Sequence, residues 1–496
     1  MNAPKINAIT AKALPVNTYN LGRLFLLAST GAVLSTVGWH GEGAYWPILL
    51  FWGVFIAYGR TPAGIFVGVT GYYLAPSWAA VLAINTALDH SIFASLLLWL
   101  AHGAINAAAW TILPVIFYLA RILTKNAFFE DQSYMYWSAV IGGGLLLTLT
   151  PPFSSLSWGN PSFIVGYLYP GSGGVGVGGV FLAWIIVLAA WCIVSQKMTL
   201  QKLSAVLMYQ AARITSWSGK ERKAGYGSIP RPSSHMANIA SNSSLRPIAA
   251  ALALALTASV YFNLSNHYDI DQKAGHKWIN EDTALDSPKS AELFTYKIKE
   301  VLSRPENRGR TIVFPESALS DHMGNIEQMM RRVAPMMREN DARVAFHAII
   351  PSLGQEDFIA NESRTYNSAI LVYSDQGLVS VYRSGQLIPA VRGNRIVPWA
   401  GGVPILKEKG RAHVVAAICY ESLLLTHWLR AWMATRGSVA SHIVVVSSIW
   451  FVDGAAGEKT DRLMRLHALR ASKMLGLPFI NAVNRAPPNN KTNGRF

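Results

Sequence analysis

The sequence predicts a multi-span helical membrane region followed by an α/β region, and three observations lead to this prediction. First, 51% of the 496 residues are hydrophobic and only 14% are charged, whereas soluble domains carry roughly 25% charged residues. Second, the deficit of charge is confined to the chain before about residue 264. Third, the remaining chain alternates short β-branched runs with amphipathic segments. A chain of this length is expected to form at least two folded units.

The N-terminal half contains long uncharged segments. A bilayer core of about 30 Å needs roughly 20 apolar residues in helical form. Segments of this kind are expected to cross the membrane at residues 24–39, 45–58, 63–84, 91–120, 137–151, 175–195 and 247–264. The fourth is longer than a perpendicular helix requires and is expected to be tilted or kinked. A soluble globule could not bury so many apolar helices at once, so the membrane interpretation is favoured.

The net charge is +16, and many of the basic residues lie where cytoplasmic loops are expected. Residues 196–246 contain one acidic residue, Glu221, and eight basic residues. These eight are Lys197, Lys202, Arg213, Lys220, Arg222, Lys223, Arg231 and Arg246. Cytoplasmic loops carry such an excess, although a solvated linker is compatible with the same pattern. The placement favours a membrane protein over one that contacts nucleic acid.

With the N-terminus in the cytoplasm, seven crossings place the end of the chain on the other side of the membrane. The predicted organisation is a membrane domain of about six helices (1–195), a basic cytoplasmic loop (196–246), a last transmembrane helix (247–264) and an external domain (265–496). In a Gram-negative host this external domain would be periplasmic.

The external half is predicted to be a layered α/β domain. Nearly continuous apolar strands are expected at 310–314, 342–350, 368–373, 377–382, 413–419 and 442–448. Helical spacing is found at 321–339, 421–436 and 458–475. Strands that are apolar throughout are covered on both faces, which is typical of an α/β architecture.

Two of these predicted strands end in residues whose side chains could take part in catalysis. Glu316 follows the apolar run TIVFP, and Cys419 ends the run HVVAAIC. A thiol is a nucleophile as its thiolate, which a carboxylate in apolar surroundings can generate near neutral pH. The dipole of a helix beginning at Glu421 would also favour a thiolate. A buried cysteine is nevertheless more often a small hydrophobic residue, so both interpretations stay open on composition alone.

The chain has one other cysteine, Cys192, within the sixth predicted span. The predicted topology keeps the two cysteines on different parts of the molecule, so no disulfide between them is expected. Cys419 would then be a thiol in an oxidising compartment, where unpaired cysteines are usually avoided. The twelve histidines show no ligand spacing, and neither a metal nor another cofactor is expected.

Several motifs resemble the nitrilase, or carbon–nitrogen hydrolase, superfamily. They are FPESAL (314–319), TYNSAILVYSDQGLVSVYR (365–383), AAICYESLL (416–424), SSIWF (447–451) and a segment interpreted as a helix, LMRLHALRASKMLGLPFINAVNR (463–485). A membrane region before such a domain, with a loop at 151–180, resembles apolipoprotein N-acyltransferase and the TraB branch of plasmid conjugal transfer.

The resemblance implies an α-β-β-α sandwich with a Glu–Lys–Cys triad. It implies that Glu316 is the general base, that Cys419 is the nucleophile and that Glu421 is the acid that follows the family cysteine. It further implies acyl transfer through a cysteine thioester in a bacterial inner membrane. Membrane phospholipid would be the acyl donor, and the N-terminus of a lipoprotein the acceptor. Trp450 and Phe451 would line a substrate pocket, unless they pack in the core.

The sequence departs from the family pattern at the lysine, whose place is taken by Ser384. Arg383 is adjacent, but neighbouring strand residues point to opposite faces, so it is a poor substitute. Lys407 and Lys409 are further alternatives. This departure favours the TraB-like branch, and it leaves open an envelope protein that supports conjugation by binding. A membrane-tethered amidase is a third possibility.

The resemblance also implies further strands and a last transmembrane helix beyond Asn484. The sequence there reads RAPPNNKTNGRF and ends. A domain that lacks edge strands exposes unpaired backbone groups, so a C-terminal truncation is expected.

Overall fold

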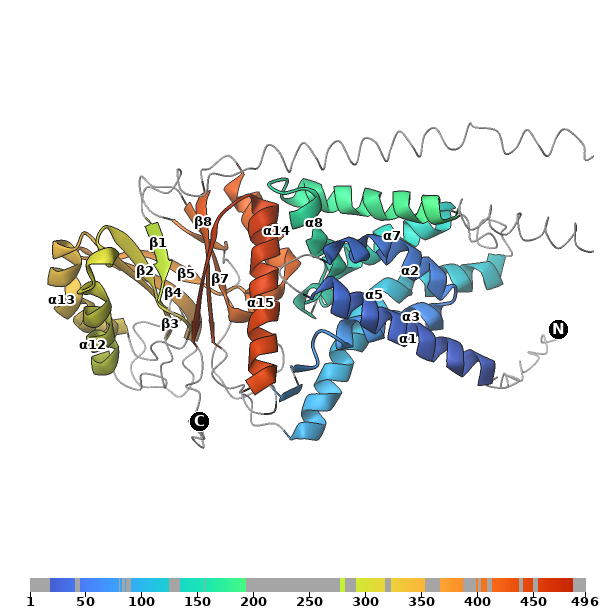
Figure 1. The fold of residues 1–496 in the computed structure, drawn as a ribbon, viewed down its shortest axis with the longest axis horizontal. Helices are drawn as coiled ribbons and strands as arrows, with labels where there is room; N and C mark the ends of the chain where they lie inside the picture. Colours follow the sequence, from blue (N-terminus) through green and yellow to red (C-terminus); the bar gives the residue numbers. More distant parts are fainter. Residues whose placement is uncertain are drawn as a thin grey trace, which may run out of the picture.

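The molecule consists of a bundle of apolar helices packed against an α/β region (Figure 1). This computed structural model describes residues 18–40, 45–79, 81–82, 85, 91–124, 134–156, 158–192, 277–281, 291–316, 323–352, 366–386, 398–399, 403–407, 413–436, 440–448 and 454–484. The predicted basic loop (196–246) and last transmembrane helix (247–264) lie outside these residues.

The N-terminal half, here named the membrane half after the spans predicted in it, contains helices joined by turns and no strand in the part that is described. Its α-helices are α1 (Thr18–Gly38), α2 (Trp52–Gly59), α3 (Pro62–Leu74), α5 (Ile92–Thr124), α7 (Tyr134–Thr148), α8 (Val165–Leu168) and the unlabelled helix Gly174–Cys192. Three 3-10 turns lie between them, η1 (Trp46–Phe51), η2 (Phe153–Leu156) and η3 (Pro161–Ile164). Within the described residues, three helices are long and apolar enough to cross a membrane: Leu21–Gly38, Ile92–Thr124 and Gly174–Cys192.

The predicted span 63–84 is interrupted by a turn at residues 75–78. Helix α3 ends at Leu74, and the chain then turns at Ala75 and Pro76. Pro76 has no N–H to donate to the carbonyl oxygen four residues earlier, which explains the interruption, and residues 79, 81, 82 and 85 are helical again. Predicted span 45–58 likewise divides into the 3-10 turn η1 and the short helix α2.

Small residues allow the helices of this half to approach closely. A Cβ atom on Gly31 of α1 would lie 2.1 Å from the carbonyl oxygen of Gly68 on α3. A Cβ atom on Gly71 of α3 would lie 2.3 Å from the carbonyl oxygen of Ala28. Only glycine fits at such positions, and membrane helices commonly pack through small residues in this way.

The C-terminal half is an α/β region, as the sequence predicts. Its strands are β1 (Lys277–Asn280), β2 (Arg310–Val313), β3 (Arg343–Pro351), β4 (Tyr366–Ser374), β5 (Gly377–Arg383), β6 (Ile405–Leu406), β7 (His413–Ile418), β8 (Ala440–Ser448) and β9 (Phe479–Asn484). Its helices are α12 (Ala291–Leu302), α13 (Met323–Glu339), α14 (Leu425–Thr435) and α15 (Gly454–Leu475), with the 3-10 turns η4 (Pro305–Asn307) and η5 (Cys419–Leu423).

These strands form two sheets. One has the order β1-β2-β3-β4-β5, with β1, β2 and β3 parallel to one another and β4 and β5 joined to them in antiparallel pairs. The other has the order β6-β7-β8-β9, with β7, β8 and β9 parallel and β6 antiparallel to β7. The parallel arrangement places the carboxyl ends of β7, β8 and β9 at one edge of their sheet.

Apolar side chains on both faces of the strands join the layers. Along β7, Val414, Ala416 and Ile418 face the other sheet, whereas Val415 and Ala417 belong to the core shared with α14, α15 and the membrane half. Helices α12 and α13 cover the outer face of the five-stranded sheet through a third apolar cluster. Helix α15 therefore stands between the sheets and the membrane half (Figure 1).

Two predicted helices differ from the structure. The segment 463–485 contains the end of α15 and then strand β9, because the chain leaves the helix at Gly476, whose φ is +66°. The predicted helix 421–436 begins instead at Leu425, after the five-residue turn η5. So short a turn carries little dipole, and the predicted effect of a helix dipole on Cys419 is not supported.

Candidate functional site

Cys419 lies at a sharp turn that follows a buried strand. Strand β7 ends at Ile418, and Cys419 has a φ of +44°. A residue with a side chain is strained by roughly 1–3 kcal/mol in this left-handed region, and such strain gathers at functional sites. The turn resembles in principle the elbows that expose a nucleophile at the end of a strand. The side chain is partly buried, and no disulfide links Cys419 to Cys192.

Glu421 holds this turn together from inside the fold. It is fully buried, and its Oε2 accepts a hydrogen bond of 3.0 Å from the backbone N–H of Ile418. The hydroxyl of Ser422 donates to the carbonyl oxygen of Cys419 at 2.7 Å. The turn is therefore closed on both sides of the cysteine. Glu421 has a positioning role here, which the sequence resemblance alone does not specify.

The carboxylate of Glu421 also joins η5 to the end of β5. The hydroxyl of Tyr382 lies 2.8 and 2.7 Å from its two oxygens. The hydroxyl of Ser384 donates to Oε1 at 2.8 Å, and the backbone N–H groups of Gly385 and Gln386 donate at 2.9 and 3.2 Å. A buried carboxylate is costly unless donors surround it, and here they come from both sheets. The pKa of Tyr382 is raised, by burial first and then by the charge of Glu421.

His427 and Arg430, both on α14, complete the surroundings of Glu421. The Nδ1 atom of His427 lies 3.9 Å from Oε1 of Glu421, and its Nε2 lies 2.9 Å from the carbonyl oxygen of Ala416, to which Nε2–H donates. Burial lowers the pKa of His427, against the opposing effect of Glu421, so the ring is neutral at pH 7. The cation beside this cluster is Arg430, whose Nη1 would lie 3.3 Å from a Cβ atom on Gly385. No sequence pattern singled out Arg430.

Ser384 occupies the place that the resemblance gives to a lysine, and it is buried. Its hydrogen bond to Glu421 means that a neutral hydroxyl replaces an ammonium group beside that carboxylate. Arg383 does not substitute for it. Its Nη1 donates at 2.9 Å to the carbonyl oxygen of Pro351 and to Oδ1 of Asn367. These contacts hold the guanidinium of Arg383 between the end of β3 and the start of β4.

Glu316 lies at the same edge of the molecule as Cys419, but on the other sheet. It follows β2 and is half-buried, and its carbonyl oxygen lies 3.5 Å from Nδ2 of Asn484 at the end of β9. The register pairs Ile418 with Val446 and Val446 with Ala482, so Cys419 continues toward the edge where β9 ends. With adjacent strands about 4.8 Å apart, both predicted residues gather at the carboxyl ends of β2, β7 and β9.

The other predicted residues lie elsewhere. Strand β6 runs antiparallel to β7 and pairs Leu406 with Val414, which places Lys407 beside the start of β7. Cys419 lies at its opposite end, so the alternative that Lys407 serves the cysteine was wrong. Trp450, Phe451 and Lys409 lie outside the described residues.

The cysteine turn also contacts the membrane half. The hydroxyl of Tyr420 donates to the carbonyl oxygen of Ser155, in η2. The rings of Tyr420 and Trp158 meet edge to face, with centroids 6.3 Å apart, and Trp158 and Cys419 pack on the same apolar cluster. Burial raises the pKa of Tyr420. The site is therefore built where the α/β region meets the loop after α7.

As a class, this is a candidate cysteine-nucleophile site in an α/β region that is packed on apolar helices. No family model matches the chain. The chain is similar to a probable conjugal transfer protein TraB of Sinorhizobium fredii, at 20% identity over 92% of this chain and 97% of that protein. It is also similar to the conjugal transfer protein TraB of Agrobacterium fabrum, at 27% identity over 32% of this chain and 36% of that protein.

Among solved structures, the chain is similar to two carbon–nitrogen hydrolases. One is a mutant of an amidase from the nitrilase superfamily of Nesterenkonia, with a TM-score of 0.29 and 12% identity over 36% of this chain and 68% of that one. The other is the carbon–nitrogen hydrolase of Helicobacter pylori, with a TM-score of 0.32 and 13% identity over 42% of this chain and 73% of that one. The predicted resemblance to TraB conjugal transfer proteins is confirmed.

Proposed function

We propose that this protein is a TraB-like acyltransferase of the bacterial inner membrane, which carries an acyl chain on Cys419 and acts in plasmid transfer. The α/β region would lie on the periplasmic side. The observation that carries the proposal is the strained turn at Cys419, tied by Glu421 and in contact with the membrane half through Tyr420.

Exposed apolar side chains support the embedding of the N-terminal half in a bilayer. On α5, Phe93 is 66% exposed and Leu123 is 82% exposed, and on α1 Phe25 is 75% exposed. Soluble monomers rarely expose large apolar surfaces. Helices that are apolar on all sides are typical of membrane segments. A bilayer would cover these side chains, and the Cys419 turn would lie near its surface.

The chemistry would proceed in two transfers. Glu316 takes the proton of the Cys419 thiol, and the thiolate attacks the carbonyl carbon of a phospholipid ester. The ester C–O bond breaks, and the lysophospholipid alkoxide leaves with the proton held by Glu316, so that a thioester remains on Cys419. The amino group at the N-terminus of a lipoprotein then attacks the thioester. An amide forms and the thiolate leaves. Glu316 passes the amine proton to this thiolate, which restores the thiol of Cys419.

Intact-mass measurement of the full chain tests this proposal. Purified protein in detergent is incubated with phospholipid of defined acyl length, and its mass is compared with that of Cys419→Ala and Cys192→Ala. We expect an increment of one acyl chain in the wild type and in Cys192→Ala, removed by hydroxylamine at neutral pH and absent from Cys419→Ala. An increment that persists in Cys419→Ala would contradict the proposal, as would the absence of any adduct with every lipid.

A second function is favoured by one observation, the presence of Ser384 beside Glu421. Removal of a donor that stabilises an oxyanion costs about 10²–10³ in rate. A protein that kept the fold but lost turnover would support conjugation by binding. In that case Cys419→Ala would transfer plasmid as well as the wild type in a mating assay, whereas the acyltransferase would lose transfer. A membrane-tethered amidase is the third candidate, and release of ammonia from small amides would identify it.

A further inference from the structure

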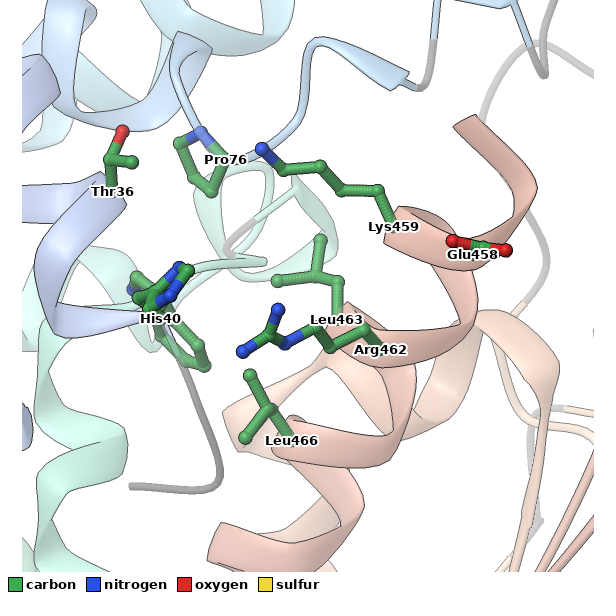
Figure 2. A pocket seen from close by; sticks show the side chains of 9 residues that line it. Thr36, His40, Pro76, Glu458, Lys459, Arg462, Leu463 and Leu466 are labelled. Carbon is green, nitrogen blue, oxygen red and sulfur yellow. The ribbon is translucent and has the colours of Figure 1, made fainter. Parts of the chain in front are cut away.

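A cleft of about 270 Å³ lies between the membrane half and the outer side of α15 (Figure 2). Three elements form it: the end of α1, the turn after α3, and the first half of α15. The lining residues are Thr36, Trp39, His40, Pro76, Glu458, Lys459, Arg462, Leu463 and Leu466. The lining of the cleft includes neither Cys419 nor Glu421, and the next residue along α15, Met464, packs instead in the cluster that holds Cys419.

Positive charge dominates the rim of this cleft. Lys459 and Arg462 are exposed, and their spacing of three residues places them on one face of α15. Figure 2 shows the guanidinium of Arg462 extending toward His40 and the amine of Lys459 extending toward Pro76. Glu458 extends away from both. In the described part of the chain, neither cation forms an ion pair, and Lys459 lies 5.5 Å from the ring centre of Trp78.

The floor of the cleft is apolar and firmly held. Leu466 and Trp39 are buried, and Leu463 is half-buried. The Trp39 ring stacks on His467 and lies 3.9 Å beneath the guanidinium carbon of Arg470. An anion that enters the cleft would therefore meet a buried apolar surface below and two exposed cations above. Arg and Lys of this kind recognise phosphate oxygens, Arg through paired N–H donors.

The position of the cleft favours a lipid headgroup as the molecule that would bring a phosphate to it. It opens where α1 and α3 end, one residue after α1 and two residues after α3. In the proposed membrane orientation this level is that of the lipid headgroups, and Trp78 beside Lys459 is 39% exposed, as an interfacial tryptophan would be. Basic pockets next to membrane helices bind lipid headgroups.

We propose that this cleft binds the phosphate of an anionic phospholipid headgroup through Lys459 and Arg462, and that the bound lipid supports the docking of α15 on the end of α1. The inference rests on the membrane embedding proposed above and does not depend on any chemistry at Cys419. Two cations that have no acidic partner among the described residues favour a lipid with net negative charge over a zwitterionic one.

Native mass spectrometry of the full chain in detergent tests the proposal. Short-chain phosphatidylglycerol is titrated against the wild type, against the double variant Lys459→Gln with Arg462→Gln, and against Arg331→Gln with Arg332→Gln. The last is a control, because it removes two exposed positive charges from α13, at the far end of the molecule (Figure 1). We expect the cleft variant to bind at least about 10-fold more weakly, and the control to bind as the wild type does.

Three further arms make the result decisive. Phosphatidylcholine should bind more weakly than phosphatidylglycerol, and Cys419→Ala should bind as the wild type does, which separates this site from the acyl-transfer proposal. Equal binding by the cleft variant and the control would overturn the inference. Inorganic phosphate that competes at the same concentration as the lipid would also overturn it, because the headgroup would then contribute nothing beyond a free anion.

Discussion

The imidazole of His467 lies flat on the indole of Trp39, with ring centroids 4.3 Å apart and planes inclined by only 14°. This stack joins α15 of the α/β region to the residue that follows α1 of the membrane half. The Nε2 atom of His467 accepts a hydrogen bond of 2.9 Å from the backbone N–H of Gly159. The ring proton therefore resides on Nδ1, which donates to the carbonyl oxygen of Leu463 at 2.8 Å. A buried, directed network therefore holds the two halves together.

Arg470 strengthens the same junction. It is fully buried, its Nη2 donates to the carbonyl oxygen of Gly38 at 2.6 Å, and its guanidinium covers the Trp39 ring. Gly38 is the last residue of α1, where carbonyl groups lack helical partners and a positive charge is favourable. The α/β region thus caps a helix of the membrane half, which fixes the level of the Cys419 turn relative to that half.

Gly166 should be essential for this junction. It lies in α8, and a Cβ atom there would be 2.2 Å from the carbonyl oxygen of Arg470. Backbone cannot yield as a flexible side chain does, so we expect Gly166→Ala to separate α8 from α15 and to destabilise the protein by on the order of 3 kcal/mol. Thermal unfolding in detergent measures the effect. Gly178→Ala is the matched control, since nothing lies within 4 Å of the added methyl group. Equal melting temperatures would contradict the expected clash.

Acid should weaken the junction through His467. Burial lowers the pKa of His467 to about 3, from 6.5. The unfolded chain therefore binds a proton that the folded chain refuses between these pH values, and the stability present above pH 6.5 is lost as the pH falls. At pH 5 the loss from this residue is about 2 kcal/mol.

The variant His467→Gln isolates this contribution. It lacks the titrating ring, so we expect the gap in melting temperature between wild type and variant to be large at pH 7.5 and smaller at pH 5. Other buried histidines, such as His347, whose pKa burial lowers to about 4, act equally in both proteins. A gap that stays constant over this pH range would show that His467 titrates normally.

Glu421 should be needed for the shape of the cysteine turn. Glu421→Gln places an amide NH₂ among donors that now converge on a carboxylate, so backbone N–H groups lose their acceptor. We expect a loss of stability on the order of 3 kcal/mol and faster amide hydrogen exchange in residues 413–424. Glu327→Gln is the control, because Glu327 is exposed and its ion pair with Arg331 is long, at 3.9 Å. Unchanged exchange around Cys419 would argue against a positioning role.

The two central residues of the site could be predicted from the sequence because each follows an apolar run. Glu316 and Cys419 end β-branched segments, and the carboxyl ends of strands gather functional groups in α/β folds. The sequence also predicted most strands, since their composition is β-branched and apolar. The helical spacing at 458–475 ends where α15 ends, but β9 was not predicted, because the segment 463–485 of the family resemblance was interpreted as one helix across Gly476 and Pro478.

The rest of the site depends on contacts between distant parts of the chain. Tyr382 and Arg430 gain their roles only when β5 and α14 meet at Glu421. A tyrosine inside an apolar strand and an arginine on an amphipathic helix have ordinary patterns, so no local signal distinguishes them. The stack of His467 on Trp39 joins opposite ends of the sequence and is equally invisible before folding.

Ser384→Lys should test what the missing lysine costs. The hydroxyl of Ser384 donates to Oε1 of Glu421, so a lysine there would place its ammonium group beside a buried carboxylate that can stabilise it. We expect formation of the Cys419 acyl adduct to accelerate by about 10²-fold, which is the usual contribution of one oxyanion donor. The rate is measured by intact mass at early times, and the same phospholipid preparation is used for every protein.

Ser384→Ala supplies the comparison for this substitution. It removes the same hydroxyl without adding a charge, so it should cost about 1 kcal/mol of stability and leave the adduct rate no higher than that of the wild type. An overpacked lysine would lower the melting temperature, and this measurement separates misfolding from chemistry. If Ser384→Lys melts as the wild type does and acylates no faster, the positive charge is already supplied from elsewhere, and Arg430 becomes the residue to substitute.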